Sequence, residues 1–213
     1  MNQTIIMASG GIESTVAAAQ ALKNGEKIYL IHYDLGRRQD PMELYAVNSF
    51  SVRNNVPLKI VKLHAFQEIF SGIIPPPLLL READEDPTGI SISIIPPLTQ
   101  LSLSFAKQAK AGKLVIGLTA EQFPHGRKKF FDLLGEANDI FQSKLHRVKI
   151  TLPFEKINKA DVIKLGAKLK LDFTNTWSCD NEIIEHCGEC SSCIVRKKAF
   201  KSAKITDPTI YSK

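Results

Sequence analysis

The chain has 213 residues, of which 44% are hydrophobic, and carries a formal net charge of +6. A chain of this size can bury a full core, so one globular domain is expected, and no uninterrupted apolar run approaches the ~18 residues of a membrane span. The basic residues are spread along the chain, so neither a nucleic acid nor a membrane partner is expected. With no leader pattern at the N-terminus, the expected location is the cytoplasm.

The first sixty residues alternate between strand and helix patterns. The predicted elements are a strand at 3–8, an alanine-rich helix at 14–25, a strand at 27–34, a helix at 41–55 and a strand at 57–63. Pro41 suits the first turn of its helix, and Gly25 suits the end of the helix before it. Such alternation is typical of a parallel sheet with crossover helices.

The pattern resumes after an interruption. Residues 71–97 hold two proline runs and an acidic segment without periodicity, which indicates a functional lid, a mobile loop or a disordered insertion. The later predicted elements are a helix at 98–112, a strand at 113–118, a helix at 130–144, a strand at 148–153 and a helix at 158–170. The sequence thus predicts an α/β fold with a parallel five-stranded sheet and helices on both faces.

A glycine loop, Ser9-Gly10-Gly11-Ile12-Glu13-Ser14, joins the first predicted strand to the first helix. Ligands gather at this place in parallel α/β sheets. Two glycines let backbone N–H groups face an anion, and the helix N-terminus adds partial positive charge, so the loop suits a phosphate or pyrophosphate. A plain tight turn is the alternative. The loop is not a Walker A motif, because no Gly-Lys-Ser/Thr follows it. It is not a dinucleotide fingerprint either, because it lacks the third glycine.

The four cysteines form a second motif. Cys179, Cys187, Cys190 and Cys193 fall within fifteen residues. Two-residue gaps between thiolates suit a tetrahedral Zn²⁺, and four sulfurs leave no open position, so one structural zinc per chain is expected. An iron–sulfur cluster and a redox dithiol are the alternatives.

Together the motifs resemble the QueC family, the 7-cyano-7-deazaguanine synthases, and the glycine loop resembles the SGGxDS loop of the PP-loop ATP pyrophosphatases. Further matching segments are YDLGRR, VIGLTAEQF, VKITLPFEKINKADVIKLG and TWSCDNEIIEHCGECSSCIVRKKAF. The resemblance implies an adenine nucleotide alpha hydrolase-like fold. It places an ATP-binding domain at 1–170 and a zinc-binding segment at 171–213 packed on it. It also implies a homodimer.

The family resemblance implies a two-step reaction. ATP with Mg²⁺ would adenylate the carboxylate of 7-carboxy-7-deazaguanine, ammonia would displace AMP to give an amide, and a second adenylation would lead to the nitrile. One alternative is transfer of a deazaguanine acid to another amine, such as a protein acceptor in an antiviral defence system. The other is a non-catalytic module that binds ATP and zinc.

The resemblance also implies roles for individual residues. Those expected to bind ATP are Ala8, Ser9, Gly10, Gly11, Ile12, Glu13, Ser14, Asp34 and Arg37. Glu13 stands where the family has aspartate, so it is expected to help bind Mg²⁺. The catalytic residues are expected to be Ser14, Lys159 as a cation on the phosphates, and Arg127.

The sequence departs from the family on the substrate side. PPLT at 96–99 replaces a PGRN-like segment, and FPHGR at 123–127 replaces a longer SGYPDCR-like loop. A site that reads a base by hydrogen bonds loses ~1–3 kcal/mol for each group left unpaired. The ATP half is therefore expected to be retained and the acceptor half to be altered.

Overall fold

A parallel β-sheet forms the centre of the computed structural model, which describes residues 3–65, 94–122, 127–141, 147–181 and 184–212. Its strands are β1 (Thr4–Met7), β2 (Ile28–Asp34), β3 (Leu58–Lys62), β4 (Lys113–Ile116) and β5 (Lys149–Thr151). They lie in the order β3-β2-β1-β4-β5, and every pairing is parallel. The predicted five-stranded parallel sheet is therefore confirmed.

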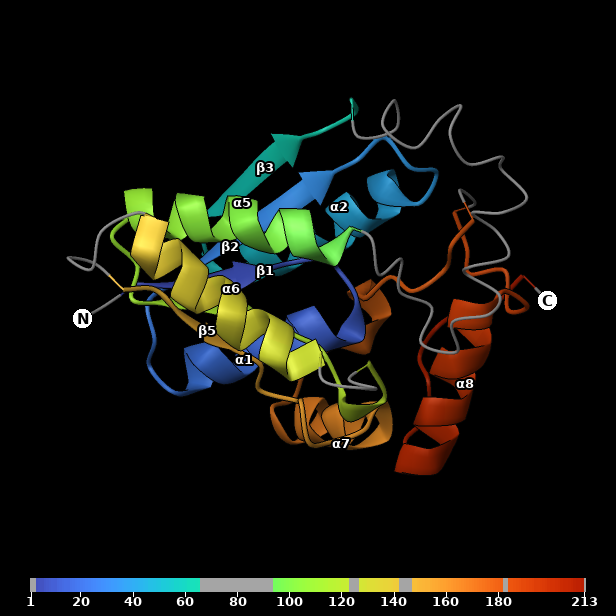
Figure 1. The fold of residues 1–213 in the computed structure, drawn as a ribbon. Coiled ribbons are helices and arrows are strands. Elements are labelled where there is room, and N and C mark those ends of the chain that lie inside the picture. Colours follow the sequence, from blue (N-terminus) through green and yellow to red (C-terminus); the bar gives the residue numbers. More distant parts are fainter. Residues whose placement is uncertain (1–2, 66–93, 123–126, 142–146, 182–183, 213) are drawn as a thin grey trace.

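Helices cover both faces of the sheet (Figure 1). They are α1 (Ile12–Lys23), α2 (Asp40–Asn54), α5 (Ile95–Gln108), α6 (Arg127–Phe141), α7 (Lys159–Lys168) and α8 (Ser191–Ala203). Among the described residues, the 3₁₀ turn η1 (Ala120–Gln122) lies between β4 and α6, and η3 (Phe173–Asn175) lies between α7 and α8. Among the described residues, no helix is both long and apolar enough to cross a bilayer.

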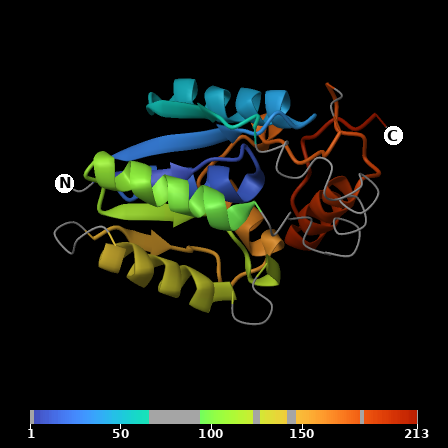
Figure 2. The same cartoon turned by 45° about the horizontal axis from the view of Figure 1, so that its top comes forward.

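The alternation of strand residues builds two separate cores. Ile6 and Leu30 face the layer that contains α1 and α7, whereas Ile5 and Ile31 face α5 and α6. Successive strand side chains point to opposite faces, so each apolar run serves both cores. Turning the molecule shows α8 standing beyond one end of the sheet (Figure 2).

The observed helix bounds differ from the predicted ones by up to four residues, and one helix was not predicted. Helix α5 begins at Ile95 rather than at residue 98, because prolines occupy its first turn, where a backbone N–H has no partner within the helix. The lid, mobile loop or disordered insertion was predicted over 71–97; residues 95–97 belong to this helix instead, and 71–93 lie outside the described residues. Helix α8 was not predicted; Cys190 is its N-cap, and its sulfur accepts a hydrogen bond from the Cys193 N–H.

Candidate functional site

The glycine loop lies at the centre of the sheet, where the chain connections lead to neighbouring strands on opposite sides of β1. Strand β1 pairs with β2 on one side and with β4 on the other, and the loop follows the carboxyl end of β1. The Ser14 hydroxyl donates to the Gly11 carbonyl oxygen at 3.2 Å and accepts from the Ser9 N–H at 3.2 Å. Gly11 caps the N-terminus of α1. Hydroxyls, amides and a helix N-terminus thus converge at the expected ligand crevice.

Two glycines allow neighbouring backbone to approach this loop. Gly10 has φ +78°, and a Cβ at this residue would lie 2.6 Å from the Glu43 carbonyl oxygen of α2. A Cβ at Gly117, which follows β4, would lie 2.8 Å from the Glu13 carbonyl carbon and 2.9 Å from the Ser14 nitrogen. The loop is therefore enclosed by α2 on one side and by the end of β4 on the other.

A charged pair lies beside the loop. The Lys159 ammonium is 2.8 Å from a Glu13 carboxylate oxygen, and both side chains are mostly buried. The Lys159 N–H at the start of α7 faces the Glu121 carboxylate oxygens at 3.2 and 3.3 Å. The structure thus brings together the loop and the lysine that the sequence singled out, and it adds Glu121, which the sequence did not.

A cavity of about 280 Å³ opens beside the loop. Ser9, Glu13 and Ser14 line it, together with Arg37. On its other side the first turn of α5 contributes apolar side chains, including Leu98. Its volume is near the lower end of small-molecule sites, which enclose roughly 300–1,000 Å³.

Arg37 is held by two carboxylates. Its Nε donates to Asp40 Oδ1 at 2.8 Å, and its Nη2 donates to Glu43 Oε2 at 2.8 Å. Burial raises the pKa of Glu43 to about 7, although the Arg37 charge opposes this change. Asp34 is not among the described residues that line the cavity, and its carboxylate lies 3.0 Å from His64 Nε2. The expected roles of Arg37 and Asp34 in ATP binding stay predictions.

His32 is a cavity residue that the sequence did not single out. The ring is almost fully buried, and Nδ1 lies 2.8 Å from the Ala8 carbonyl oxygen, so Nδ1 carries the proton. Burial lowers the pKa of His32, which keeps the ring neutral. Its Nε2 has no hydrogen-bond partner among the described residues. Its position two residues before the end of β2 was the available signal.

Arg127 begins α6, but its side chain lies outside the described residues, as does the segment 123–126 before it. Its predicted catalytic role therefore stays a prediction.

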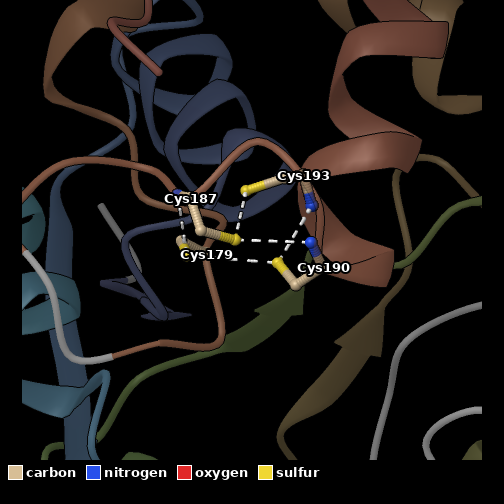
Figure 3. Close-up of side chains that lie close together, drawn as sticks. All are labelled: Cys179, Cys187, Cys190 and Cys193. Carbon is tan, nitrogen blue, oxygen red and sulfur yellow. Dashed lines mark hydrogen bonds between the residues drawn. The ribbon is translucent and has the colours of Figure 1, made fainter. Parts of the chain in front are cut away.

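The four cysteines form a compact cluster (Figure 3). Their sulfur atoms all lie within 4.8 Å of one another, and the pairs Cys187–Cys193 and Cys179–Cys190 have sulfurs 4.0 Å apart. Metal–sulfur bonds of ~2.3 Å in a tetrahedron place sulfurs about 3.8 Å apart. The cluster therefore fits a tetrahedral metal ion of the size and softness of zinc.

Backbone donors support the sulfurs. The N–H groups of Cys187 and Asn181 donate to Cys179 Sγ at 3.4 Å, and the Cys193 N–H donates to Cys190 Sγ at 3.4 Å. Burial raises the pKa of the Cys179 thiol to about 11. Four thiolates with sulfurs this close would repel one another, so a bound cation would be needed to keep all four ionised, as in a metal site.

Known proteins resemble this chain over its full length. Residues 3–204 match the family described as Queuosine biosynthesis protein QueC. The chain is 30% identical to the 7-cyano-7-deazaguanine synthase of Thermoplasma volcanium, over 99% of this chain and 91% of the relative. It is 30% identical to that of Picrophilus torridus, over 99% of this chain and 92% of the relative.

Among solved structures, NMN synthetase from Francisella tularensis matches with a TM-score of 0.49 and 16% identity, over 97% of this chain and 78% of that one. A match at this level adds nothing to the assignment, which depends on the family match. With that match spanning residues 3–204, the chain belongs to the QueC family.

Proposed function

We propose that this chain is a 7-cyano-7-deazaguanine synthase, an ATP-dependent ligase that converts 7-carboxy-7-deazaguanine to the nitrile with ammonia. The observation that carries the proposal is the convergence of the Ser14 hydroxyl, the loop amides and the Lys159–Glu13 pair at the carboxyl end of β1. Full-length similarity to proteins of that name supports the choice of reaction.

In the proposed reaction, an oxygen of the substrate carboxylate attacks the α-phosphorus of ATP, and the bond to pyrophosphate breaks. Ammonia then attacks the acyl carbon, AMP leaves, and a proton is released to give the amide. The amide oxygen is adenylated by a second ATP, and loss of AMP and a proton leaves the nitrile. Two ATP molecules thus become two AMP and two pyrophosphate molecules.

The protein contributes by holding groups and neutralising charge. The loop amides and the Ser14 hydroxyl would hold the pyrophosphate portion of ATP. Lys159 would place its ammonium on the phosphates, and Glu13 would help hold Mg²⁺, which supplies further neutralising charge when bound. The two side chains lie 2.8 Å apart, so the Lys159 ammonium is already beside the loop that contains Glu13.

We further propose that the cysteine cluster holds one zinc ion per chain. Four thiolates leave no position for a water or substrate, so the ion would stabilise the C-terminal segment and take no part in the chemistry. A division into an ATP-binding domain at 1–170 and a zinc segment at 171–213, a homodimer and a cytoplasmic location complete the proposal; these rest on family resemblance.

One observation favours a second candidate for the acceptor step. Where relatives carry a cation and an amide before the central helix, this chain presents the first turn of α5, whose Leu98 lines the cavity. The Thr99 hydroxyl donates to the Ile95 carbonyl oxygen at 2.8 Å, so it is already paired within the helix. A more apolar wall suits delivery of the activated acid to an amine other than ammonia, such as a protein acceptor.

Incubation with ATP, Mg²⁺, 7-carboxy-7-deazaguanine and ammonium, followed by mass spectrometry of the base and AMP, separates these candidates. The nitrile with two AMP per base supports the synthase. Accumulated amide or a mass increase on a protein supports amine transfer. Absence of AMP with every deazaguanine acid tested would leave only nucleotide and metal binding.

A further inference from the structure

A segment from the metal region forms one wall of the glycine loop. Residues 173–178, here called the strap, begin with η3 and end directly before the first cysteine. The Trp177 N–H of the strap donates to the Gly10 carbonyl oxygen at 2.9 Å. Since the other side of Gly10 is closed by α2, the strap and α2 together hold this glycine in its left-handed conformation.

The strap is itself fixed by Arg196 of α8. This guanidinium is fully buried, and its Nη1 donates to the Thr176 carbonyl oxygen at 3.2 Å, the Thr176 hydroxyl at 2.8 Å and the Ser178 hydroxyl at 3.3 Å. Its Nη2 donates to the Phe173 carbonyl oxygen at 3.2 Å and lies 3.2 Å from Asp207. A buried charge is stable only when paired in this way, so Arg196 holds the strap through groups at both ends and in the middle.

The cysteine cluster joins the same elements. Cys179 directly follows the strap, and Cys193 lies three residues before Arg196 on α8, within one helical turn. The His186 Nε2 accepts a hydrogen bond from the Ser178 N–H at 3.1 Å. The cluster therefore fixes α8 relative to the strap. Because α8 is held there, the Arg196 guanidinium can reach all of its hydrogen-bond acceptors in the strap.

We propose that Arg196 is a positioning residue for the nucleotide loop. It touches neither the loop nor the cavity, and acts through the strap and the Trp177–Gly10 hydrogen bond on the conformation of residues 9–14. The C-terminal segment thereby sets the affinity of the loop for the pyrophosphate portion of a nucleoside triphosphate. That the ligand is a nucleoside triphosphate rests on the proposed function. That Arg196 positions the loop through the strap does not.

Arg196→Lys tests the connection, because an ammonium keeps the charge but cannot reach Phe173, Thr176 and Ser178 at once. Hydrogen exchange of residues 9–15 without nucleotide is measured first, then the Kd for ATP with Mg²⁺ by calorimetry, and the metal content by elemental analysis. Asp207→Asn removes the charge that pairs with the Arg196 guanidinium and leaves the Arg196 side chain itself unchanged. The matched control is Phe131→Leu, which destabilises the core beneath α6 away from the strap.

Arg196→Lys is expected to speed exchange in the loop and to raise the Kd for ATP, each by about 2- to 30-fold, with the metal retained. Asp207→Asn should produce a smaller change in the same direction, and Phe131→Leu should leave the loop and the Kd unchanged. Wild-type exchange rates in the loop and a wild-type Kd for ATP in both Arg196→Lys and Asp207→Asn would overturn the proposal. If Arg196→Lys does not fold, Asp207→Asn decides alone by the same two measurements.

The two proposals fail separately in this experiment. Faster loop exchange in Arg196→Lys, with a wild-type protein that does not bind ATP, supports the positioning role and contradicts the proposed function. Unchanged exchange, with wild-type protein that binds ATP and releases AMP, supports the function and contradicts the positioning role.

Discussion

Gly117→Ala is expected to displace the glycine loop, because the added Cβ would meet loop backbone. The added Cβ would lie 2.8 Å from the Glu13 carbonyl carbon and oxygen, about 0.6 Å inside ordinary contact at 3.4 Å. These are backbone atoms, so no side chain can rotate away, and the loop or the end of β4 must shift by a similar amount. Overpacking of this kind costs about 1–3 kcal/mol of unfolding free energy.

The same shift should reduce the reaction more than the stability. A displacement of about 1 Å in a positioned group can cost 10²-fold in rate, so AMP release should fall roughly 10- to 100-fold. The melting temperature should fall by about 2–4 °C for each kcal/mol lost. Thermal unfolding and single-turnover AMP release measure the two effects.

Gly135→Ala is the matched control. Gly135 lies in α6, and its added Cβ would meet only a side-chain methyl of Ile150 at 4.0 Å. Removing a glycine from a helix interior stabilises it by about 0.5–1 kcal/mol, so this variant should be slightly more stable and equally active. Wild-type activity and stability in Gly117→Ala would mean that β4 does not approach the loop as described, and the reasoning would be refuted.

Three further predictions concern the loop, a buried carboxyl and the metal. Ser14→Ala should lower AMP release without changing the metal content, and unchanged release would remove the hydroxyl from the mechanism. Burial raises the pKa of Glu43 to about 7, so the native chain keeps a proton that the unfolded chain loses above pH 4.5. This stabilisation, at most about 3 kcal/mol, is complete below pH 4.5 and is lost as the pH rises through 7. Urea unfolding should show a flatter pH dependence in Glu43→Gln, and an equal slope would contradict the assignment. Cys190→Ser should lose one zinc per chain and make residues 171–213 sensitive to protease; iron with visible absorbance in the purified wild type would refute the zinc assignment.

The sequence predicted the sheet because each strand is a short apolar run bounded by turn residues. It did not predict α8, although Cys193, Ala199, Phe200 and Ala203 are buried along one face of that helix. Arg196 occupies the same face, so a cation interrupts the apolar stripe on which helix prediction depends. The guanidinium is buried only because distant groups of the strap accept its hydrogen bonds, and no local pattern contains that information.

The candidate site was predicted in part for a related reason. Ser14, Glu13 and the cysteines belong to motifs in which residue type and spacing carry the chemistry. Gly117 and Glu121 depend instead on how the end of β4 and the 3₁₀ turn after it meet α1 and α7. Such approaches between distant segments become visible only in the folded chain.

The hydrogen bond between Trp177 and Gly10 also bears on how the protein matures during translation. During synthesis the glycine loop and strands β1 to β5 emerge before the strap and the cysteines do. Domains tend to fold as they emerge, so the sheet can form around a loop that still lacks one wall. The wall of the loop formed by the strap would then be completed only after residues 173–178 have been synthesised and the Trp177 N–H has reached the Gly10 carbonyl oxygen.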